Sequence, residues 1–322
     1  MTKLARDPLA PEGSPRFVRL ADGRRLAYCE YGDPGGRASL YCHGFPSSRI
    51  EARLLHEEAK GAGVRVISPD RPGYGDSDPD PQRTLLKWAE DILGLADQLA
   101  LHAFDLIGVS GGGPYALACL ARIPERVRAC ALVCPLGPIY LDPVRIEMRL
   151  VTRVSFTLAH QSPDLARLLH GGALPALIAA SPWLIDGVRT LNAGASDRAA
   201  LQDRLAREVL TRSVQEAMRV GARGARQDLA LYTQPWNIDF GALTQPIALW
   251  HGDADNTVPL AHARWYAEHL AGCSLRILPG EGHYSLPLRH GGDILRSLEA
   301  ESFQAGPWGA PADISRPEHA EP

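Results

Sequence analysis

The sequence predicts an α/β protein built on a parallel sheet with helices on both faces. Short apolar segments alternate with helix-like segments through the first 136 residues, which is the pattern of parallel strands joined by helices. A glycine-rich turn that contains a serine joins one of these strands to the next helix. The alternation then stops for about a hundred residues before strand signals return, which indicates a helical insertion. A chain of 322 residues is long enough for one such domain with an insertion.

The elements can be assigned in chain order from apolar runs and turn signals. An early β-hairpin is expected around the turn Asp22-Gly23. The expected strands are residues 17–20, 26–31, 38–42, 64–68, 105–109, 128–134, 247–251 and 274–278. The expected helices are residues 48–60, with Gly61 as C-cap, 85–101, and 112–123, with Pro114 in the first turn.

These elements divide the chain into four parts. Residues 1–136 and 237–302 are expected to form the core, and residues 137–236 a helical cap over the C-terminal edge of the sheet. Residues 303–322 are rich in Pro, Ala, Gly and charge, and we expect a disordered tail there. Residues 168–185 lack Asp, Glu, Lys and Arg for nearly the length of a membrane span. Glycines and prolines interrupt them, so we interpret them as apolar surface.

Composition excludes several functional classes. Hydrophobic residues make up 45% of the chain and charged residues 22%, as in an ordinary soluble enzyme. The net charge of −3 gives no basic field for nucleic acid. The six cysteines form no Cys-x-x-Cys pair, and residues 1–13 lack the apolar run of a signal peptide. We therefore expect free thiols, a cytoplasmic location, no membrane span and a small-molecule partner; the oligomeric state is not predicted.

The serine of the glycine-rich turn is the candidate nucleophile. The motif Gly108-Val109-Ser110-Gly111-Gly112 follows an apolar strand and precedes an apolar helix, which is the setting that a nucleophile elbow requires. Glycines are needed because the turn is tight and a Cβ would clash. The turn lifts the Ser110 hydroxyl clear of the sheet. It also leaves the Gly111 amide free at the helix start, where an oxyanion would develop.

Two other interpretations of this turn remain. The serine could be incidental in a glycine-rich turn, because short motifs of this kind also arise by chance. Gly111, Gly113 and Ala116 also have the spacing of a dinucleotide-binding fingerprint. However, the next strand ends at Pro135 without an acid for the ribose, so we favour the nucleophile.

A serine nucleophile needs a base, and the base needs an acid. His283 is the candidate base, because it lies in a glycine-flanked loop shortly after the last expected strand. Asp253 and Asp255 both follow strand 247–251 and are rival acids. We favour Asp255, and we expect Asp253 to shape the turn by bonding nearby backbone.

The segment His43-Gly44-Phe45-Pro46 follows the strand expected beside the elbow strand. We expect the Phe45 N–H to be the second oxyanion donor beside Gly111. Pro46 has no N–H, so that donor cannot lie one residue later. His43 is expected to be structural rather than catalytic. Ser47 and Ser48 are expected to be helix N-caps.

Taken together, these motifs resemble the α/β-hydrolase superfamily. The resemblance covers residues 17–136 and 237–300. It rests on the elbow, the chain order of Ser110, Asp255 and His283, and four further motifs: His43-Gly44, Asp70-Arg71-Pro72-Gly73-Tyr74-Gly75, Gly252-x-x-Asp255-x-x-Val258-Pro259 and Gly282-His283. It implies a mostly parallel eight-stranded sheet, with a helical cap between strands six and seven. It also implies a triad of Ser110, Asp255 and His283, and an oxyanion hole made by Phe45 and Gly111.

The resemblance also narrows the chemistry. The chain lacks the triple-glycine loop of some esterases, which makes bulky tertiary-alcohol esters poor candidates. Haloalkane dehalogenases and epoxide hydrolases that resemble this pattern carry Asp at the elbow, where this chain has Ser110. The expected function is therefore that of a serine hydrolase acting on an ester or related carbonyl substrate through an acyl-enzyme, with no cofactor and no metal.

Several alternatives fit the same residues. The triad also suits C–C bond hydrolysis, acyl transfer to an alcohol and perhydrolysis. From other classes, the chain could be a biosynthetic cyclase or a non-catalytic binding protein. We expect the cap to determine which substrate binds. Its apolar side chains either pack on the core or line an apolar pocket; they are Leu174, Leu177, Ile178, Trp183 and Leu184.

Overall fold

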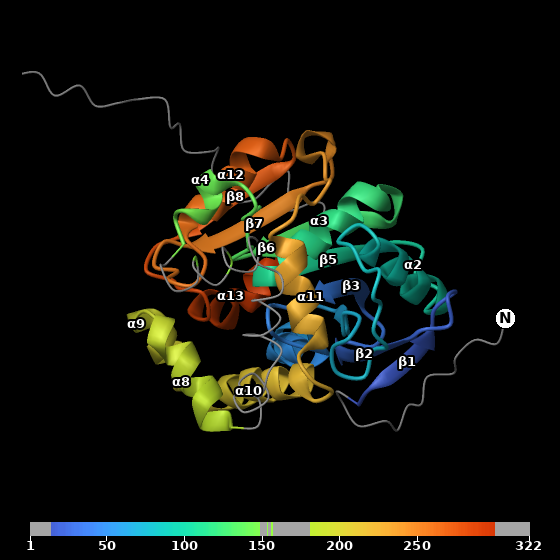
Figure 1. The fold of residues 1–322 in the computed structure, drawn as a ribbon, viewed down its shortest axis with the longest axis horizontal. Coiled ribbons are helices and arrows are strands. Elements are labelled where there is room, and N and C mark those ends of the chain that lie inside the picture. Colours follow the sequence, from blue (N-terminus) through green and yellow to red (C-terminus); the bar gives the residue numbers. More distant parts are fainter. Residues whose placement is uncertain (1–13, 149–152, 154–155, 157–180, 300–322) are drawn as a thin grey trace, which may run out of the picture.

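The computed structural model describes residues 14–148, 153, 156 and 181–299. Within these residues, eight strands form one sheet in the order β1-β2-β4-β3-β5-β6-β7-β8 (Figure 1). The strands are β1 (Arg16–Arg19), β2 (Arg25–Gly32), β3 (Arg37–Cys42), β4 (Val64–Pro69), β5 (Phe104–Val109), β6 (Val127–Val133), β7 (Ile247–Gly252) and β8 (Cys273–Leu278). Each expected strand is present, with its ends within a residue of the expected ones.

The sheet is mostly parallel, as predicted. Strand β2 pairs antiparallel with β1 and β4, and the other neighbours pair in parallel. Strand β3 lies between β4 and β5, so that Ser39 is in register with both Val66 and Asp105. Strands β4, β5 and β7 are buried along their whole length, because helices cover both faces. The parallel order brings the C-terminal ends of β3, β5 and β7 to one edge of the sheet.

Helices cover the sheet in two layers. On one face, the apolar core includes residues of α2 (Trp88–Gln98), α3 (Gly113–Arg122) and α12 (Leu260–His269). On the other, it includes residues of the 3₁₀ helix η1 (Arg49–Leu55), α1 (His56–Gly61) and α13 (Ser285–Arg296). The expected C-cap at Gly61 is wrong, because Gly61 is still helical and Ala62 is the C-cap. The left-handed backbone that favours glycine falls at Gly63, where φ is +63°.

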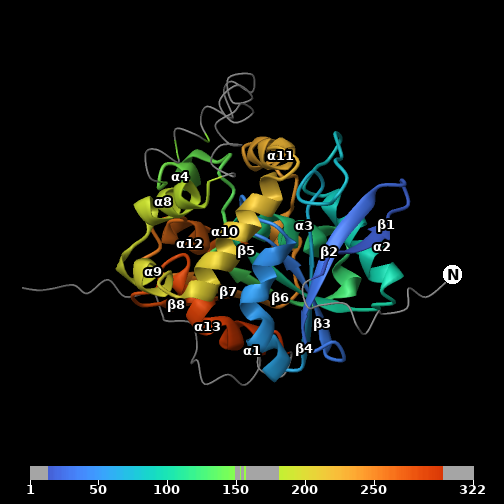
Figure 2. The same ribbon diagram turned by 90° about the horizontal axis from the view of Figure 1, so that it is seen from below.

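The insertion between β6 and β7 is helical, as predicted. Its described helices are α4 (Asp142–Arg145), α8 (Pro182–Asn192), α9 (Ala195–Ala200), α10 (Arg204–Met218) and α11 (Arg223–Tyr232). Helices α8, α9 and α10 lie on one side of the molecule, with α8 between α9 and α10, and α11 lies over the middle of the sheet in the view of Figure 1 (Figures 1 and 2). Three of the expected apolar cap residues, Leu174, Leu177 and Ile178, and the expected tail 303–322 lie outside the described residues. No helix of the described residues is long and apolar enough to cross a membrane.

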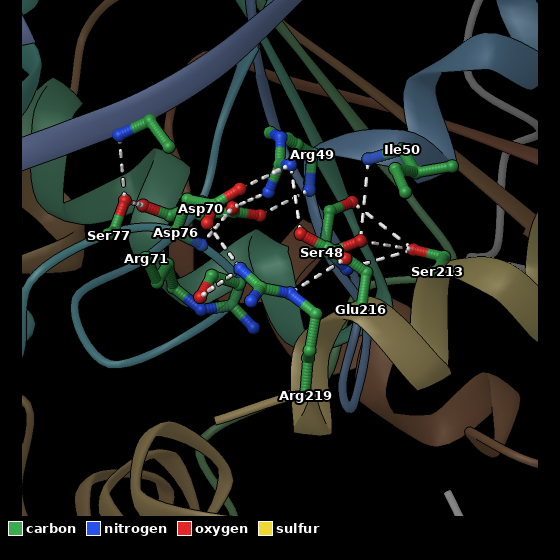
Figure 3. Close-up of polar contacts among 12 residues, drawn as sticks. Ser48, Arg49, Ile50, Asp70, Arg71, Asp76, Ser77, Ser213, Glu216 and Arg219 are labelled. Carbon is green, nitrogen blue, oxygen red and sulfur yellow. Dashed lines mark hydrogen bonds and ion pairs between the residues drawn. The ribbon is translucent and has the colours of Figure 1, made fainter. Parts of the chain in front are cut away.

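Helix α10 is attached to the core through polar side chains (Figure 3). The buried Ser213 hydroxyl accepts a hydrogen bond from the Ser48 N–H at 2.9 Å and lies 2.8 Å from the Ser47 hydroxyl. Arg49, which is almost fully buried, forms ion pairs with Asp70 and, at 2.9 Å, with Glu216 of α10. Ser48 is the N-cap of η1, as expected. Ser47 is not an N-cap, because its hydroxyl contacts the Ser213 hydroxyl of helix α10 instead.

Candidate active site

The turn after β5 has the geometry of a nucleophile elbow. Ser110 has φ +52°, a conformation that a residue with a side chain adopts only under local constraint. A Cβ on Gly111 would lie 2.6 Å from the Phe45 Cβ, and one on Gly112 only 2.0 Å from the Cys42 carbonyl oxygen. Both positions therefore require glycine, as the sequence suggested. The side chain of Ser110 is partly exposed and lines a cavity.

The fold brings the three expected residues of the triad together from distant parts of the chain. His283 Nε2 lies 3.1 Å from Ser110 Oγ, and His283 Nδ1 lies 2.8 Å from Asp255 Oδ2. Asp255 follows β7, and His283 lies between β8 and α13. The second carboxylate oxygen of Asp255 accepts hydrogen bonds from the Thr257 and Val258 amides at 2.8 and 2.9 Å, which fixes the side chain.

Electrostatics favour proton uptake by this histidine. Burial alone would lower the pKa of His283, but the charge and the hydrogen bond of Asp255 outweigh it and raise the pKa above its ordinary value. Burial likewise acts to raise the pKa of Asp255, and the His283 charge and hydrogen bond outweigh it and lower that pKa. A carboxylate that stays ionised beside an imidazole can stabilise the imidazolium.

The rival acid, Asp253, bonds to a backbone amide of another loop rather than to the His283 ring. Asp253 is exposed, and its carboxylate accepts a hydrogen bond from the Gly280 amide at 2.7 Å. It therefore joins the loop after β7 to the loop after β8. This differs from the expected bond to its own nearby backbone, because the partner amide is 27 residues away.

The His43–Pro46 segment lies against the elbow. Arg71 donates hydrogen bonds to the carbonyl oxygens of His43 and, at 2.8 Å, Gly44. The Gly44 carbonyl and the Phe45 N–H belong to one peptide unit, so Arg71 also fixes the direction of that N–H. His43 is fully buried, its Nε2 accepts from the Arg71 amide at 3.3 Å, and burial holds its pKa well below the ordinary value. A neutral, buried imidazole fits the expected structural role.

A buried carboxylate from the cap holds this side of the site. Asp228 of α11 accepts hydrogen bonds from Arg71 at 3.0 Å, Tyr74 at 2.7 Å and Tyr115 at 2.5 Å, and it pairs with Arg83. Burial acts to raise the pKa of Asp228, but the two guanidinium charges outweigh it and lower that pKa.

One helical turn further along α11, the Tyr232 hydroxyl donates to the Gly111 carbonyl at 2.8 Å. The Tyr232 ring also packs edge-on against the Phe45 ring, with 5.5 Å between the ring centroids. One cap helix therefore contacts both segments that carry the expected oxyanion donors. This network could not be predicted from the sequence, because a polar residue on an amphipathic helix is ordinarily exposed.

A cavity of about 210 Å³ opens at Ser110 between core and cap. Much of its wall is apolar: Phe45, Leu54, Ile107, Val133, Ile185, Val188, Leu210 and Val214. Two ionisable side chains that sequence analysis missed also line it, Glu51 of η1 and Arg189 of α8. Burial raises the pKa of Glu51, whose carboxylate accepts from the Gly44 amide at 2.7 Å. Arg189 pairs with Asp186 at 3.0 Å.

Of the apolar cap residues that were expected either to pack on the core or to line a pocket, Trp183 and Leu184 do not line this cavity. Trp183 is 72% exposed, and neither side chain belongs to the cavity wall. The wall is formed instead by Ile185, Val188 and Arg189, which share one face of α8. Trp183 precedes Ile185 by two residues, or about 200° around the helix, and therefore faces solvent.

One group of possible metal ligands occurs among the described residues. Cys134, His251 and Asp255 are buried, and their ligand atoms lie within 4.8 Å of one another. Asp255 is already bonded to His283, and burial raises the pKa of the Cys134 thiol well above its ordinary value, which opposes thiolate formation. The donor set does not fit a metal without breaking the contact to His283.

A doubly covered parallel sheet, with a serine at a strand-to-helix turn and a histidine within hydrogen-bond distance, defines the class of α/β hydrolases. A family model described as the alpha/beta hydrolase family matches residues 40–296, and the chain belongs to that family.

Similar proteins within the family carry different activities. A 2-hydroxymuconate semialdehyde hydrolase of Pseudomonas putida is 27% identical over 299 residues, which cover 90% of this chain and 95% of the relative. An epoxide hydrolase of Caballeronia sordidicola is 34% identical over 120 residues, 36% of each chain. The solved structure of an esterase from Exiguobacterium antarcticum has a TM-score of 0.66 and 18% identity, and the match covers 91% of this chain and all of the esterase. This last likeness concerns the fold alone.

Proposed function

We propose that this protein is a serine hydrolase that cleaves an ester or related carbonyl compound through an acyl-enzyme. The observation that carries the proposal is the contact chain from Ser110 Oγ to His283 Nε2 at 3.1 Å and from His283 Nδ1 to Asp255 at 2.8 Å. Nucleophile, base and orienting acid then stand in the relation that acyl transfer needs.

In the proposed reaction, Ser110 Oγ attacks the carbonyl carbon while His283 Nε2 takes the hydroxyl proton. The amides of Phe45 and Gly111 stabilise the oxyanion, and Asp255 stabilises the imidazolium. His283 then gives its proton to the leaving alcohol, and the acyl group stays on Ser110. Water deprotonated by His283 attacks the acyl carbon, and the acid is released as Ser110 regains its proton.

The cavity supports a substrate of modest size that is mainly apolar. About 210 Å³ of mostly apolar wall suits a short or medium acyl chain better than a long one. Arg189 and Glu51 offer two polar anchors at the wall, so one polar group on the substrate can be accommodated.

A second candidate is hydrolysis of a C–C bond next to a ketone. The similarity to the 2-hydroxymuconate semialdehyde hydrolase extends over 90% of this chain and favours it. Within the cavity, the Arg189 guanidinium could pair with a substrate carboxylate. Water would then add to the ketone, and the C–C bond would break with a proton delivered to the leaving carbon.

The test combines active-site labelling with a substrate panel. We expect a fluorophosphonate to label Ser110 in the native protein and not in Ser110→Ala. We expect p-nitrophenyl esters of short acyl chains to turn over, with Ser110→Ala reduced about a thousandfold or more in kcat. Near-native turnover by that variant, or labelling elsewhere, would overturn the nucleophile assignment.

A parallel assay separates the two candidate reactions. A carboxylated vinylogous diketone is offered beside the esters, and Arg189→Leu is compared with the native protein. Preference for the diketone, lost in Arg189→Leu, would favour C–C hydrolysis. Preference for neutral esters, unaffected by that change, would favour the esterase.

A further inference from the structure

A second cap carboxylate contacts the loop that carries His283. Asp197 of α9 is completely buried. Its Oδ2 accepts a hydrogen bond from the His283 amide at 3.1 Å, and its Oδ1 accepts from the Tyr284 and Ser285 amides, both at 2.9 Å. These amides lie at the start of α13, where backbone N–H groups have no partner within the helix. A residue 86 positions earlier in the chain therefore caps this helix.

The fit between the carboxylate and the loop explains the glycine before the base. A Cβ on Gly282 would lie 2.4 Å from Asp197 Oδ1. Any side chain at residue 282 would push the carboxylate away from the three amides. The Gly282-His283 pair thus depends on a contact that no local feature of the loop reveals.

We propose that Asp197 is a positioning residue for His283: it holds the base at hydrogen-bond distance from Ser110 and adds a second negative charge beside the imidazole. The inference rests on the proposed function, since it takes His283 to be the base. It makes correct placement of the base depend on the docked cap, because the cap supplies the carboxylate.

Several charged or titratable groups act on the imidazole of His283. Burial opposes its protonation, and Asp255 from the loop after β7 has the largest favourable influence. Asp197 from α9 and Glu51 from η1 also raise the pKa, whereas His251 of β7 is a like-charged neighbour when it is protonated. Asp197 differs from Asp255 because it contacts only the backbone of the loop and not the ring.

Two substitutions separate geometry from charge. In Asp197→Asn, the side-chain oxygen can still accept from Tyr284 and Ser285, but the charge is gone. His283 must be neutral to act as base, so activity rises with pH through its pKa. Loss of a neighbouring negative charge lowers that pKa, and the acid limb of the kcat/KM profile should move to lower pH. Asp197→Ala loses all three hydrogen bonds, and we expect a fall of about 100-fold in kcat with little change in KM.

A matched control lies in the same cap. Asp203 is the N-cap of α10, is exposed, and accepts from the Ala206 amide at 2.7 Å. Asp203→Ala also removes a helix cap, but it leaves the His283 loop untouched. We expect native kcat and a native acid limb for this variant. Circular dichroism and thermal unfolding identify any variant that does not fold. If Asp197→Ala does not fold, Asp197→Asn and Asp197→Ser are used for the test in its place.

The outcomes distinguish this inference from the proposed function. If the native protein is not labelled at Ser110 by a fluorophosphonate, the proposed function fails and this inference fails with it. If the native protein is labelled but the folded Asp197 variants keep native kcat, the positioning role alone is overturned. Reduced kcat with an unmoved acid limb in every Asp197 variant would also overturn it, because that result describes a structural contact only.

Discussion

Core and cap contribute to the site in different ways. The core supplies the three side chains that contact one another, Ser110, His283 and Asp255, each just beyond the C-terminal end of a strand. The cap supplies two buried carboxylates that do not touch these side chains. Asp197 accepts from the backbone of the loop that carries His283, and Asp228 contacts Arg71, which donates to the His43 and Gly44 carbonyl oxygens. In the proposed mechanism, the core therefore supplies the reacting groups, and the cap carboxylates hold the segments around them in place.

The two cap carboxylates also differ from each other. Asp197 accepts from three backbone amides on the base side. Asp228 forms ion pairs with Arg71 and Arg83 and accepts hydrogen bonds from tyrosine hydroxyls, on the side of the site where the His43–Pro46 segment lies. Removing Asp228 would leave two buried cations without their partner, whereas removing Asp197 would leave only amides. We therefore expect Asp228 to matter more for stability, and Asp197 more for the pH dependence of activity.

The largest effect on turnover is expected in the core. Asp255→Asn should reduce kcat by about a thousandfold or more, because the imidazolium loses its carboxylate and the ring loses its tautomer control. Asp253→Asn removes only the bond to the Gly280 amide and should stay within about tenfold of native. Steady-state kinetics on the same ester measure both. A larger loss for Asp253→Asn would reverse the assignment of the acid.

The largest effect on stability is expected in the cap. Asp228→Ala should lower the free energy of unfolding by about 3–5 kcal/mol, since it breaks a buried ion pair by removing one partner. Glu208→Ala breaks an exposed pair with Arg212 in the same cap and should cost less than about 1 kcal/mol. Urea unfolding of both variants gives the difference. Equal losses would show that the buried network does not anchor α11.

The same network predicts a dependence of stability on pH. In the folded protein the pKa of Asp228 is held below its ordinary value of 3.8, so the contribution of Asp228 to the free energy of unfolding is complete above that pH. It is lost as the pH falls through the folded pKa. The free energy of unfolding of the native protein should therefore exceed that of Asp228→Asn by less below about pH 4 than at neutral pH. Urea unfolding of both proteins from pH 7 to pH 3 measures this difference in free energy of unfolding. A difference that does not change with pH would contradict the ionised state of Asp228.

An intermediate effect is expected where the cap contacts the elbow. Tyr232→Phe keeps the ring against Phe45 and removes the hydroxyl that donates to the Gly111 carbonyl. We expect kcat to fall by about three- to tenfold, in line with the loss of about 1 kcal/mol for one hydrogen bond. Tyr266→Phe is the matched control, because its buried hydroxyl donates to the Leu136 carbonyl. A similar fall in kcat for both would remove any special role for Tyr232.

The smallest effect is expected on the outer face of the cap. Trp183→Ala should leave kcat/KM unchanged, because the side chain faces solvent. Ile185→Ala enlarges the cavity and should raise KM for short acyl esters by a few-fold, or about 1 kcal/mol of lost contact. Kinetics across a series of acyl lengths compare the two. A raised KM for Trp183→Ala would place substrate outside this cavity.

Features that depend on short segments could be predicted from the sequence. The strands, the elbow and the positions of Ser110, Asp255 and His283 follow from apolar runs, turn residues and chain order. Interactions that join distant segments through ordinary residues could not be predicted. The Arg71–Asp228 contact spans 157 positions, and the Asp197–His283 contact spans 86. Helical periodicity can indicate which face of a helix is buried, but not which polar group it meets.

By itself, the sequence determined the sheet, the helical insertion and the candidate nucleophile, base and acid, because tight turns and buried strands restrict residue type locally. Only the tertiary structure decided how the cap meets the core. It placed Asp197 against the loop that carries His283, Asp228 against Arg71 behind the His43–Pro46 segment, and Arg189 rather than Trp183 at the cavity. These contacts depend on the packing angle and rotation of helices, which are set by the whole interface and not by any short run of residues.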